Sequence, residues 1–313
     1  MRQTSPLKVR SAVLAAVLGA LVLPAAPAQA SFPGANGVIA WTHPVGLFND
    51  SEVFIINPDG TGKRTLTDND RNDGFPSWSP TGQAIAYESS SATDVDVYIL
   101  DGDGERNLTN DPGHANRYPA WSPDGSTIVF SRQTPFSQNG ALWLIDVDGT
   151  NMRRITSPGV VNEQPSWSPD GRWIAFSSDR GGDHDLWVVR PDGTGLRQVT
   201  DTPSFQEGNP NWSPDGGRLA YDICESATFP CPGSPNYEIV TANADGTGVR
   251  RLTNVDGIDF NPAWSPDGTQ IVFRSDRTGF THLFTMNADG SDQTQLTFRD
   301  FTGGVDPDWQ PLP

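Results

Sequence analysis

The sequence has few of the residues on which many enzymes and membrane proteins depend. It contains two cysteines and four histidines, and no two histidines share a spacing typical of a zinc site, such as H-x3-H. Basic residues are scarce, because 21 Lys and Arg face 38 Asp and Glu, for a net charge of −17. Such a charge repels nucleic acid and anionic lipid, so we expect no nucleic-acid partner. After residue 30 no stretch is apolar enough to cross a bilayer, so we also expect no membrane insertion.

The first 30 residues differ in character from the rest. Arg2, Lys8 and Arg10 lead into the apolar run SAVLAAVLGALVL, which is followed by the small residues APAQA. A basic start, a short apolar run and an A-x-A cleavage site are typical of a secretory signal peptide. We therefore expect residues 1–30 to be a signal peptide and the protein to be exported, to the periplasm or outside the cell. A disulfide can persist there, so we expect Cys224 and Cys231 to pair.

A repeat of 43 to 52 residues dominates residues 31–313. Its clearest mark is a tryptophan that follows a proline by two positions, at Trp78, Trp121, Trp167, Trp212, Trp264 and Trp309. Periods of this length indicate a propeller or a solenoid. Each repeat contains four short segments of β-branched and aromatic residues bounded by Gly, Pro and Asp, and no helical periodicity appears. The sequence therefore predicts an all-β fold, a β-propeller with four-stranded antiparallel blades, in which the tryptophans pack between blades.

The two ends of the repeat region are expected to share one blade. The first repeat begins with GVIAW (37–41), continues with EVFIIN (52–57) and KRTLT (63–67), and has no tryptophan strand before them. The segment DPDWQ (306–310) is such a strand, with no further strands after it. Because unpaired strand edges are prone to aggregation, we expect this C-terminal strand to complete the first blade and to close a ring of six blades.

The repeat PxWSPDGxxIxFxSxRxG…DGxxxxxLT resembles the WD-like repeat of TolB-like β-propellers, found in the Tol–Pal envelope system, in tricorn-type proteases and in prolyl oligopeptidases. The resemblance covers residues 37–310. The G-x-S-x-G motif of the oligopeptidase hydrolase domain is not present in the sequence. The resemblance therefore implies a stand-alone TolB-like propeller.

Candidate site residues come from the segments that differ between repeats. These variable loops lie on one predicted face, where binding usually resides on a rigid scaffold. Polar side chains just before the inner strands are expected to rim the central channel: Asp73, Arg117, Glu163, Glu207, Asp259 and Asp306. Converging carboxylates suit a hard cation such as calcium, and the alternative is a hydrated polar funnel without a specific ion.

Two classes of function remain open. The first is an exported, monomeric, non-catalytic propeller that binds a protein or peptide of the cell envelope on its variable-loop face. The second is a metal-dependent enzyme of the lactonase or lyase kind, with a channel cation as Lewis acid. An enzyme also needs a proton-transfer group beside the metal, and the sequence offers no convincing pair of base and nucleophile. We therefore favour binding and assign no catalytic residue, no metal ligand and no cofactor beyond the calcium alternative.

Overall fold

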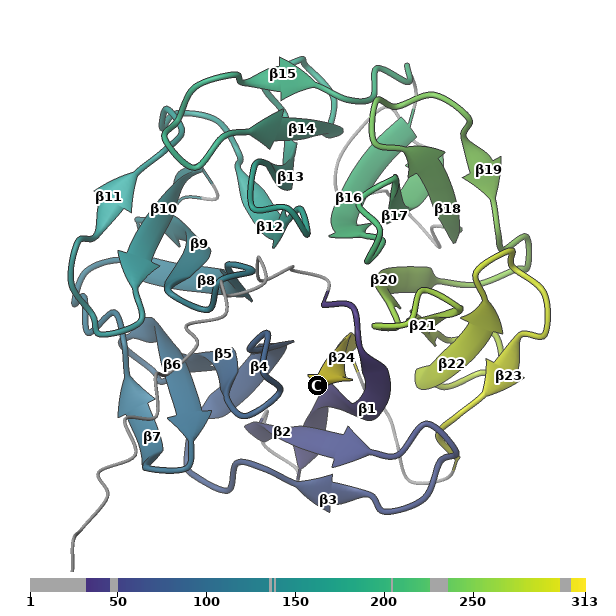
Figure 1. Ribbon diagram of the computed structural model, residues 1–313, viewed down its shortest axis with the longest axis horizontal. Coiled ribbons are helices and arrows are strands. Elements are labelled where there is room, and N and C mark those ends of the chain that lie inside the picture. Colours follow the sequence, from purple (N-terminus) through teal and green to yellow (C-terminus); the bar gives the residue numbers. More distant parts are fainter. Residues whose placement is uncertain are drawn as a thin grey trace, which may run out of the picture.

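The computed structural model describes residues 32–313, apart from 46–49, 135–136, 138, 204, 226–235 and 299–304. In this part of the chain every regular element is a β-strand, and the strands surround a central axis (Figure 1). Among these described residues no helix is long and apolar enough to cross a membrane. The expected signal peptide lies outside the described residues.

Strands at four successive distances from the axis recur along the chain. The inner strands, which carry the repeated tryptophans, are β4 (Asn72–Trp78), β8 (Ala115–Trp121), β12 (Glu163–Trp167), β16 (Phe205–Trp212), β20 (Asp259–Trp264) and β24 (Val305–Leu312). The second strands are β1 (Ala35–Val45), β5 (Ile85–Ser90), β9 (Thr127–Gln133), β13 (Ile174–Ser178), β17 (Arg218–Glu225) and β21 (Gln270–Ser275). The third strands are β2 (Asp50–Ile56), β6 (Val95–Asp101), β10 (Gly140–Asp146), β14 (Asp185–Val189), β18 (Tyr237–Asn243) and β22 (His282–Asn287).

Five of the six outer strands in the described chain are shorter than the sequence predicts, and β7 (Gly104–Asn107) is the exception. The other five are β3 (Arg64–Thr65), β11 (Arg153–Arg154), β15 (Arg197–Gln198), β19 (Arg250–Arg251) and β23 (Thr294–Gln295). The expected strand 63–67 is thus reduced to two residues, because the threonine that ends the segment bonds through its side chain. Thr67 Oγ1 accepts a hydrogen bond of 2.9 Å from Val53 N in the neighbouring strand. Likewise, Thr253 Oγ1 accepts a hydrogen bond of 2.8 Å from Ile239 N. In both places the threonine hydroxyl takes the position of a backbone carbonyl that would otherwise extend the strand pairing.

The hydrogen-bonded sheets confirm an all-β propeller but not six separate sheets. Four sheets have four strands each, and β4–β11 form one eight-stranded sheet. Within that sheet two consecutive sets of four strands meet where β6 and β8 run parallel, at Val95 and Ala115. Of the expected six-bladed propeller with four-stranded blades, the sheets therefore confirm the all-β propeller alone.

The predicted closure of the ring is present. The sheet order β24-β1-β2-β3 places the C-terminal strand beside the first strand of the described chain. These two strands pair antiparallel, with Ile39 opposite Trp309 and Ala40 opposite Asp308. In Figure 1 the yellow β24 and the purple β1 accordingly lie side by side.

The tight turns after the tryptophans follow from their composition. In the turn that follows Trp121, Gly125 has φ of 70° and its N–H donates to the Ser122 carbonyl oxygen at 2.9 Å. Ser122 Oγ donates to Asp124 Oδ1 at 2.6 Å and accepts from Thr127 N at 3.0 Å. Glycine supplies the positive φ, while the serine and aspartate side chains fix the loop to its own backbone.

The core consists of clusters between successive sets of strands. The six repeated tryptophans are between 3% and 6% exposed, and each belongs to a different cluster. Trp167 of β12, for example, belongs to a cluster with Leu142 and Leu144 of β10 and with Phe176 of β13. The tryptophan side chains therefore join neighbouring sets of strands.

Candidate binding site in the central channel

Six residues with unusual backbone geometry occupy the same position in the inner strands. Each directly precedes the proline of the Pro-x-Trp segment and has φ between 50° and 56°; we call them the channel ring: Phe75, Tyr118, Gln164, Asn209, Asn261 and Asp306. Positive φ is uncommon for residues other than glycine, so a repeated instance requires a cause. The strand register shifts here in all five hairpins where the inner strand precedes its partner, for example between Gly74 and Ser77, as in a β-bulge. A bulge redirects a side chain, and here it directs these six residues toward the channel.

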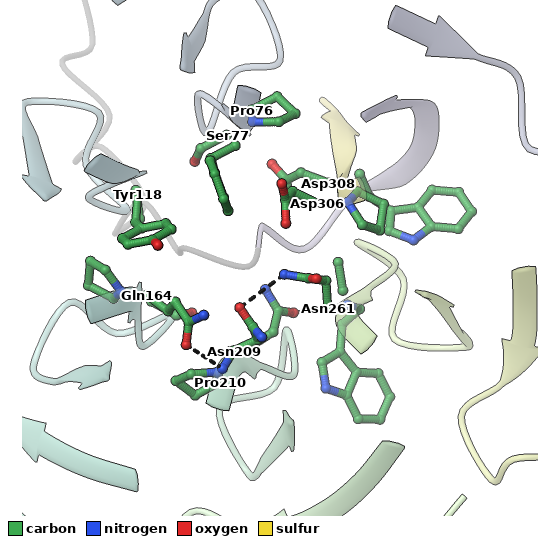
Figure 2. A pocket seen from close by; sticks show the side chains of 18 of the residues that line it. Pro76, Ser77, Tyr118, Gln164, Asn209, Pro210, Asn261, Asp306 and Asp308 are labelled. Atoms are coloured by element: carbon green, nitrogen blue, oxygen red, sulfur yellow. Dashed lines mark hydrogen bonds between the residues drawn. The ribbon is translucent and has the colours of Figure 1, made fainter. Parts of the chain in front are cut away.

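The channel ring has an aromatic side and an amide side, and Figure 2 labels Tyr118 of the first and Gln164, Asn209 and Asn261 of the second. Phe75 and Tyr118 form an edge-to-face pair with ring centroids 4.6 Å apart. Gln164 Oε1 accepts a hydrogen bond from Asn209 N at 3.0 Å, and Asn261 Nδ2 donates to Asn209 Oδ1 at 3.0 Å. Asp306 is the sixth member and the only ionisable carboxylate of the ring. The ring can therefore offer aromatic faces, amide groups and one negative charge to a ligand.

The channel ring lines a cavity of about 160 Å³. That space accommodates roughly five waters, and it is smaller than the approximately 300–1,000 Å³ of most small-molecule sites. Its wall also includes Phe32 and Pro266, and Pro266 belongs to a tight turn that follows an inner strand. The cavity therefore lies toward the tight-turn end of the inner strands. The variable loops connect at the other end, and several of them fall outside the described residues.

Charged groups from the second strands lie behind the channel ring. Glu88 of β5 is 5% exposed and forms an ion pair with Arg117. Burial raises the pKa of Glu88 to about 7, although the Arg117 charge opposes this shift. Asp222 of β17 is 1% exposed and accepts from Asn209 Nδ2 at 2.8 Å and from Asn261 N at 3.1 Å. Burial also raises the pKa of Asp222 to about 7.

Asp306 is the least satisfied of these groups. It is 9% exposed, and its Oδ2 has no hydrogen-bond partner among the described residues. Burial raises the pKa of Asp306 to about 8, with the charges of Glu88 and Asp222 acting in the same direction and Arg274 opposing them. Arg274 Nε is also buried without a partner in the described part of the chain. Asp308, two residues away, also lines the cavity, but its Oδ2 accepts from Trp78 N at 2.7 Å.

The predicted rim residues do not converge on the channel as a group. Asp73 is fully buried, and its carboxylate accepts from Ser89 Oγ at 2.6 Å and from Asn69 Nδ2 at 2.8 Å. Asp259 is fully buried in the same way, bonded to Ser275 Oγ at 2.6 Å and to Arg277 Nη2 at 2.6 Å. Both residues stand three positions before the proline of their strand, where the side chain is held within its own set of strands.

The other predicted rim residues are divided between local contacts and the channel. Glu207 is 3% exposed and accepts from Thr200 Oγ1, and burial raises its pKa to about 7. Arg117 is held by its ion pair with Glu88. Glu163 is 9% exposed, and burial raises its pKa to about 7, with the Asp179 charge acting in the same direction. Of the six predicted residues, Asp306 alone lines the cavity.

The geometry does not favour the calcium alternative. Among the residues that the structure describes, no group of three or more His, Cys, Asp or Glu side chains is arranged to hold a metal ion. The predicted carboxylates stand one, two or three positions before the proline of their repeat, so they do not occupy equivalent places in the strands. Sequence reasoning missed Phe75, Tyr118, Gln164, Asn209 and Asn261. The available signal was the position directly before each repeated proline.

Comparisons with known proteins agree with this architecture. The TolB β-propeller domain family matches residues 39–231 and 205–311. The Tol-Pal system protein TolB of Bordetella pertussis is 43% identical over 54 residues, a match that spans 17% of this chain and only 12% of that protein. The crystal structure of TolB from Acinetobacter baumannii superposes with a TM-score of 0.73 at 23% identity, covering 88% of this chain and 67% of that one.

A more distant structure bears on the enzyme hypothesis. An oligogalacturonate lyase in complex with manganese superposes with a TM-score of 0.59 at 16% identity, covering 86% of this chain and 85% of the lyase. A likeness at this level shows a shared fold only. The ring of strands and the repeated tryptophan segments define a β-propeller of the TolB type. The chain belongs to the TolB β-propeller family.

Proposed function

We propose that this protein is an exported, non-catalytic β-propeller that binds a protein or peptide of the cell envelope. The observation that carries the proposal is family membership across most of the repeat region, together with a relative named as a Tol-Pal system protein. Export is supported by the signal-peptide pattern of residues 1–30. We also infer six blades, because β4–β7 and β8–β11 each repeat the four-strand order of the separate sheets.

The described side chains support binding better than catalysis. Ser177 Oγ and His184 Nδ1 are 3.5 Å apart, which resembles a pair of nucleophile and base. However, Ser177 Oγ donates to the Glu207 carbonyl oxygen at 2.8 Å, and the two residues are only 1% and 6% exposed. A substrate would not reach this hydroxyl, so the pair serves packing. The channel ring is accessible through its cavity and presents groups that bind without reacting.

The proposal is tested by capturing a partner from cell extract and then measuring its direct binding to the purified propeller. The chain 31–313 is immobilised and exposed to native envelope extract and to culture fluid, with metal analysis of the purified chain in parallel. We expect a captured protein that, once purified, binds saturably to the monomeric propeller, with the monomer checked by light scattering. Turnover of a lactone or a uronate oligomer by the metal-loaded chain, without any saturable protein partner, would contradict the proposal.

We further propose that Cys224 and Cys231 form a disulfide that fixes the longest variable loop for binding. Cys224 is buried in β17, whereas Cys231 lies outside the described residues. A disulfide that closes a loop this short stabilises the fold by about 2–3 kcal/mol at most. Its larger effect is expected on binding, because a loop that is already ordered loses less entropy when it binds. We expect the double substitution Cys224→Ser/Cys231→Ser to change the melting temperature little and to weaken binding of the captured protein. Two free thiols in the exported protein, measured by mass spectrometry, would refute the pairing.

A further inference from the structure

The channel carries an excess of negative groups over positive ones. Five carboxyl groups lie in or directly behind the channel ring, whereas two guanidinium groups oppose them: Glu88, Glu163, Asp222, Asp306 and Asp308 against Arg117 and Arg274. Arg117 is already paired with Glu88. Buried charges are costly unless they are paired, so this arrangement requires either bound protons or a cation.

Two unsatisfied acceptors lie at one side of the cavity. Asp306 Oδ2 has no partner in the described structure, although Asp306 is more than nine-tenths buried and lines the cavity. Asn261 Oδ1, from the neighbouring inner strand, is also buried without a partner there. Figure 2 shows Asp306 and Asn261 on the same side of the pocket, with Tyr118 opposite them. Carboxylate and amide oxygens accept hydrogen bonds from N–H donors, and an aromatic face attracts a cation.

We propose that the channel ring is a binding site for an alkylammonium or alkylguanidinium group, with Asp306 as its counter-ion. The volume of the cavity is suited to one extended side chain rather than to a drug-sized ligand. The chemistry matches a lysine or arginine side chain of a protein partner. It also matches the α-amino group of this chain after cleavage behind Ala30, because that amine is one residue before Phe32, which lines the cavity.

Binding of such a cation is linked to release of a proton. Without a ligand, burial and the neighbouring carboxylates Glu88 and Asp222 favour the protonated form of Asp306, and Arg274 opposes them. A cation beside Asp306 favours the ionised form, so the proton is released to solvent as the ligand enters. We therefore expect affinity for the cation to increase as the pH rises from about 6 to 9.

The chain offers matched variants for testing the site. Asp306→Asn removes the charge and keeps the shape, and asparagine already occupies the equivalent ring positions 209 and 261 with φ of 50° and 53°. Asp292→Asn is the control, because Asp292 is exposed, has φ of 55° and lies on an outer turn where the equivalent residue is Asn151, also with φ of 55°. Neither substitution should strain the backbone.

The experiment titrates n-butylammonium, n-butylguanidinium and the neutral n-butylurea into chain 31–313, with a free or an acetylated α-amine. Binding is followed by NMR through the indole N–H signals of the cavity-lining tryptophans, Trp121, Trp167, Trp264 and Trp309. We expect saturable shifts with either cation and none with the urea. The affinity for the cation is expected to be about tenfold weaker in Asp306→Asn and unchanged in Asp292→Asn. Binding only after acetylation identifies the chain's own amine as the occupant, and binding to both forms indicates a partner's side chain.

The inference would be overturned by no shift with either cation, by equal shifts with the urea, or by equal affinity in Asp306→Asn and the parent chain. Calcium alone producing the shifts would also overturn it, in favour of a hard-cation site. The inference rests on the proposed function in one respect only, namely that a protein partner supplies the lysine or arginine side chain. If capture yields no direct partner, the proposed function fails and the titration remains valid. If the titration fails, a captured partner still supports the proposed function.

Discussion

At the scale of single residues, the repeated tryptophans and the residues three positions before them have different tasks. The tryptophan lies between sets of strands, where its size is used for packing. The channel ring residue lies on a bulge and faces the cavity. The sequence displays the first task openly because the tryptophan is repeated, whereas the second is performed by a residue that changes from repeat to repeat.

Replacement of Trp264 by alanine is expected to destabilise the whole protein. Trp264 is 4% exposed, packs with Leu252, Ile271 and Phe273, and has the Arg218 guanidinium 4.6 Å from its ring centroid. Loss of a buried aromatic leaves a cavity, so we expect Trp264→Ala to lower the free energy of unfolding by about 3–5 kcal/mol. Urea unfolding measures this change. Trp173→Ala, at a half-buried position, is the control; an equal effect at both sites would contradict the packing role.

The channel ring shows where prediction from sequence ended and why. Asp73 and Asp259 were predicted to rim the channel because they precede the inner strands, and Asp306 was chosen for the same reason. Only Asp306 stands directly before the proline, where the bulge turns the side chain inward. Asp73 and Asp259 instead accept hydrogen bonds from a serine of the adjacent strand, and Asp259 also accepts one from Arg277, just beyond that strand. A bulge of one residue changes side-chain direction, and spacing alone does not reveal where it falls.

At the scale of elements, strand order was predictable and strand length was less so. The assignment of 306–310 to the first set of strands followed from counting strand types, and β24 beside β1 confirms it. Five of the outer strands were overestimated because their final threonine resembles a strand residue. Its hydroxyl instead accepts from the third strand, for example Thr67 from Val53 N. Side chains that bond to the backbone compete with ladders, and this competition is hard to read from propensity.

Removal of residues 305–313 is expected to weaken the entire ring. Without β24, the inner edge of β1 loses its partner and Trp309 leaves its cluster with Ile39 and Trp41. An open edge and an unfilled core act on the whole fold rather than on one end. We expect a single, cooperative melting transition at a clearly lower temperature by calorimetry. The control adds a synthetic peptide of residues 305–313, which is expected to restore part of the loss, while a scrambled peptide is not. An unchanged melting temperature would mean that β24 is a dispensable tail.

At the scale of the whole molecule, the buried carboxyl groups have a shared consequence for stability. Burial raises the pKa to about 7 in Glu88, Glu163, Glu207, Asp222 and Asp308 and to about 8 in Asp306. In the unfolded chain these groups titrate near 4. Between the two values the folded state binds more protons than the unfolded state, so the free energy of unfolding decreases as pH rises.

Histidines act in the opposite direction, but over a lower range of pH. Burial lowers the pKa of His43 to about 4 and also lowers the pKa of His184 and His282. These folded values lie below the ordinary 6.5, so histidine contributions increase with pH and are complete once pH exceeds about 6.5. Aspartates in exposed turns, such as Asp148, have a lowered pKa because of hydrogen bonds from Thr150, and they affect stability only below about pH 4.

Once the α-amine, which titrates at about pH 8, is acetylated, the carboxyl groups act alone between about pH 6.5 and 8.5. We expect the melting temperature of the acetylated chain 31–313 to fall across this range. Asp306→Asn is expected to reduce the slope, because the variant no longer loses a stabilising proton, while the exposed control Asp292→Asn keeps it. Calorimetry at constant ionic strength measures both effects, and n-butylammonium provides an internal check. A cation that pairs with the ionised form of Asp306 stabilises the folded state most at high pH, so its presence is expected to flatten the curve in the parent chain alone. A melting temperature that stays level or rises between pH 6.5 and 8.5 would show that the channel carboxyl groups are already ionised and paired.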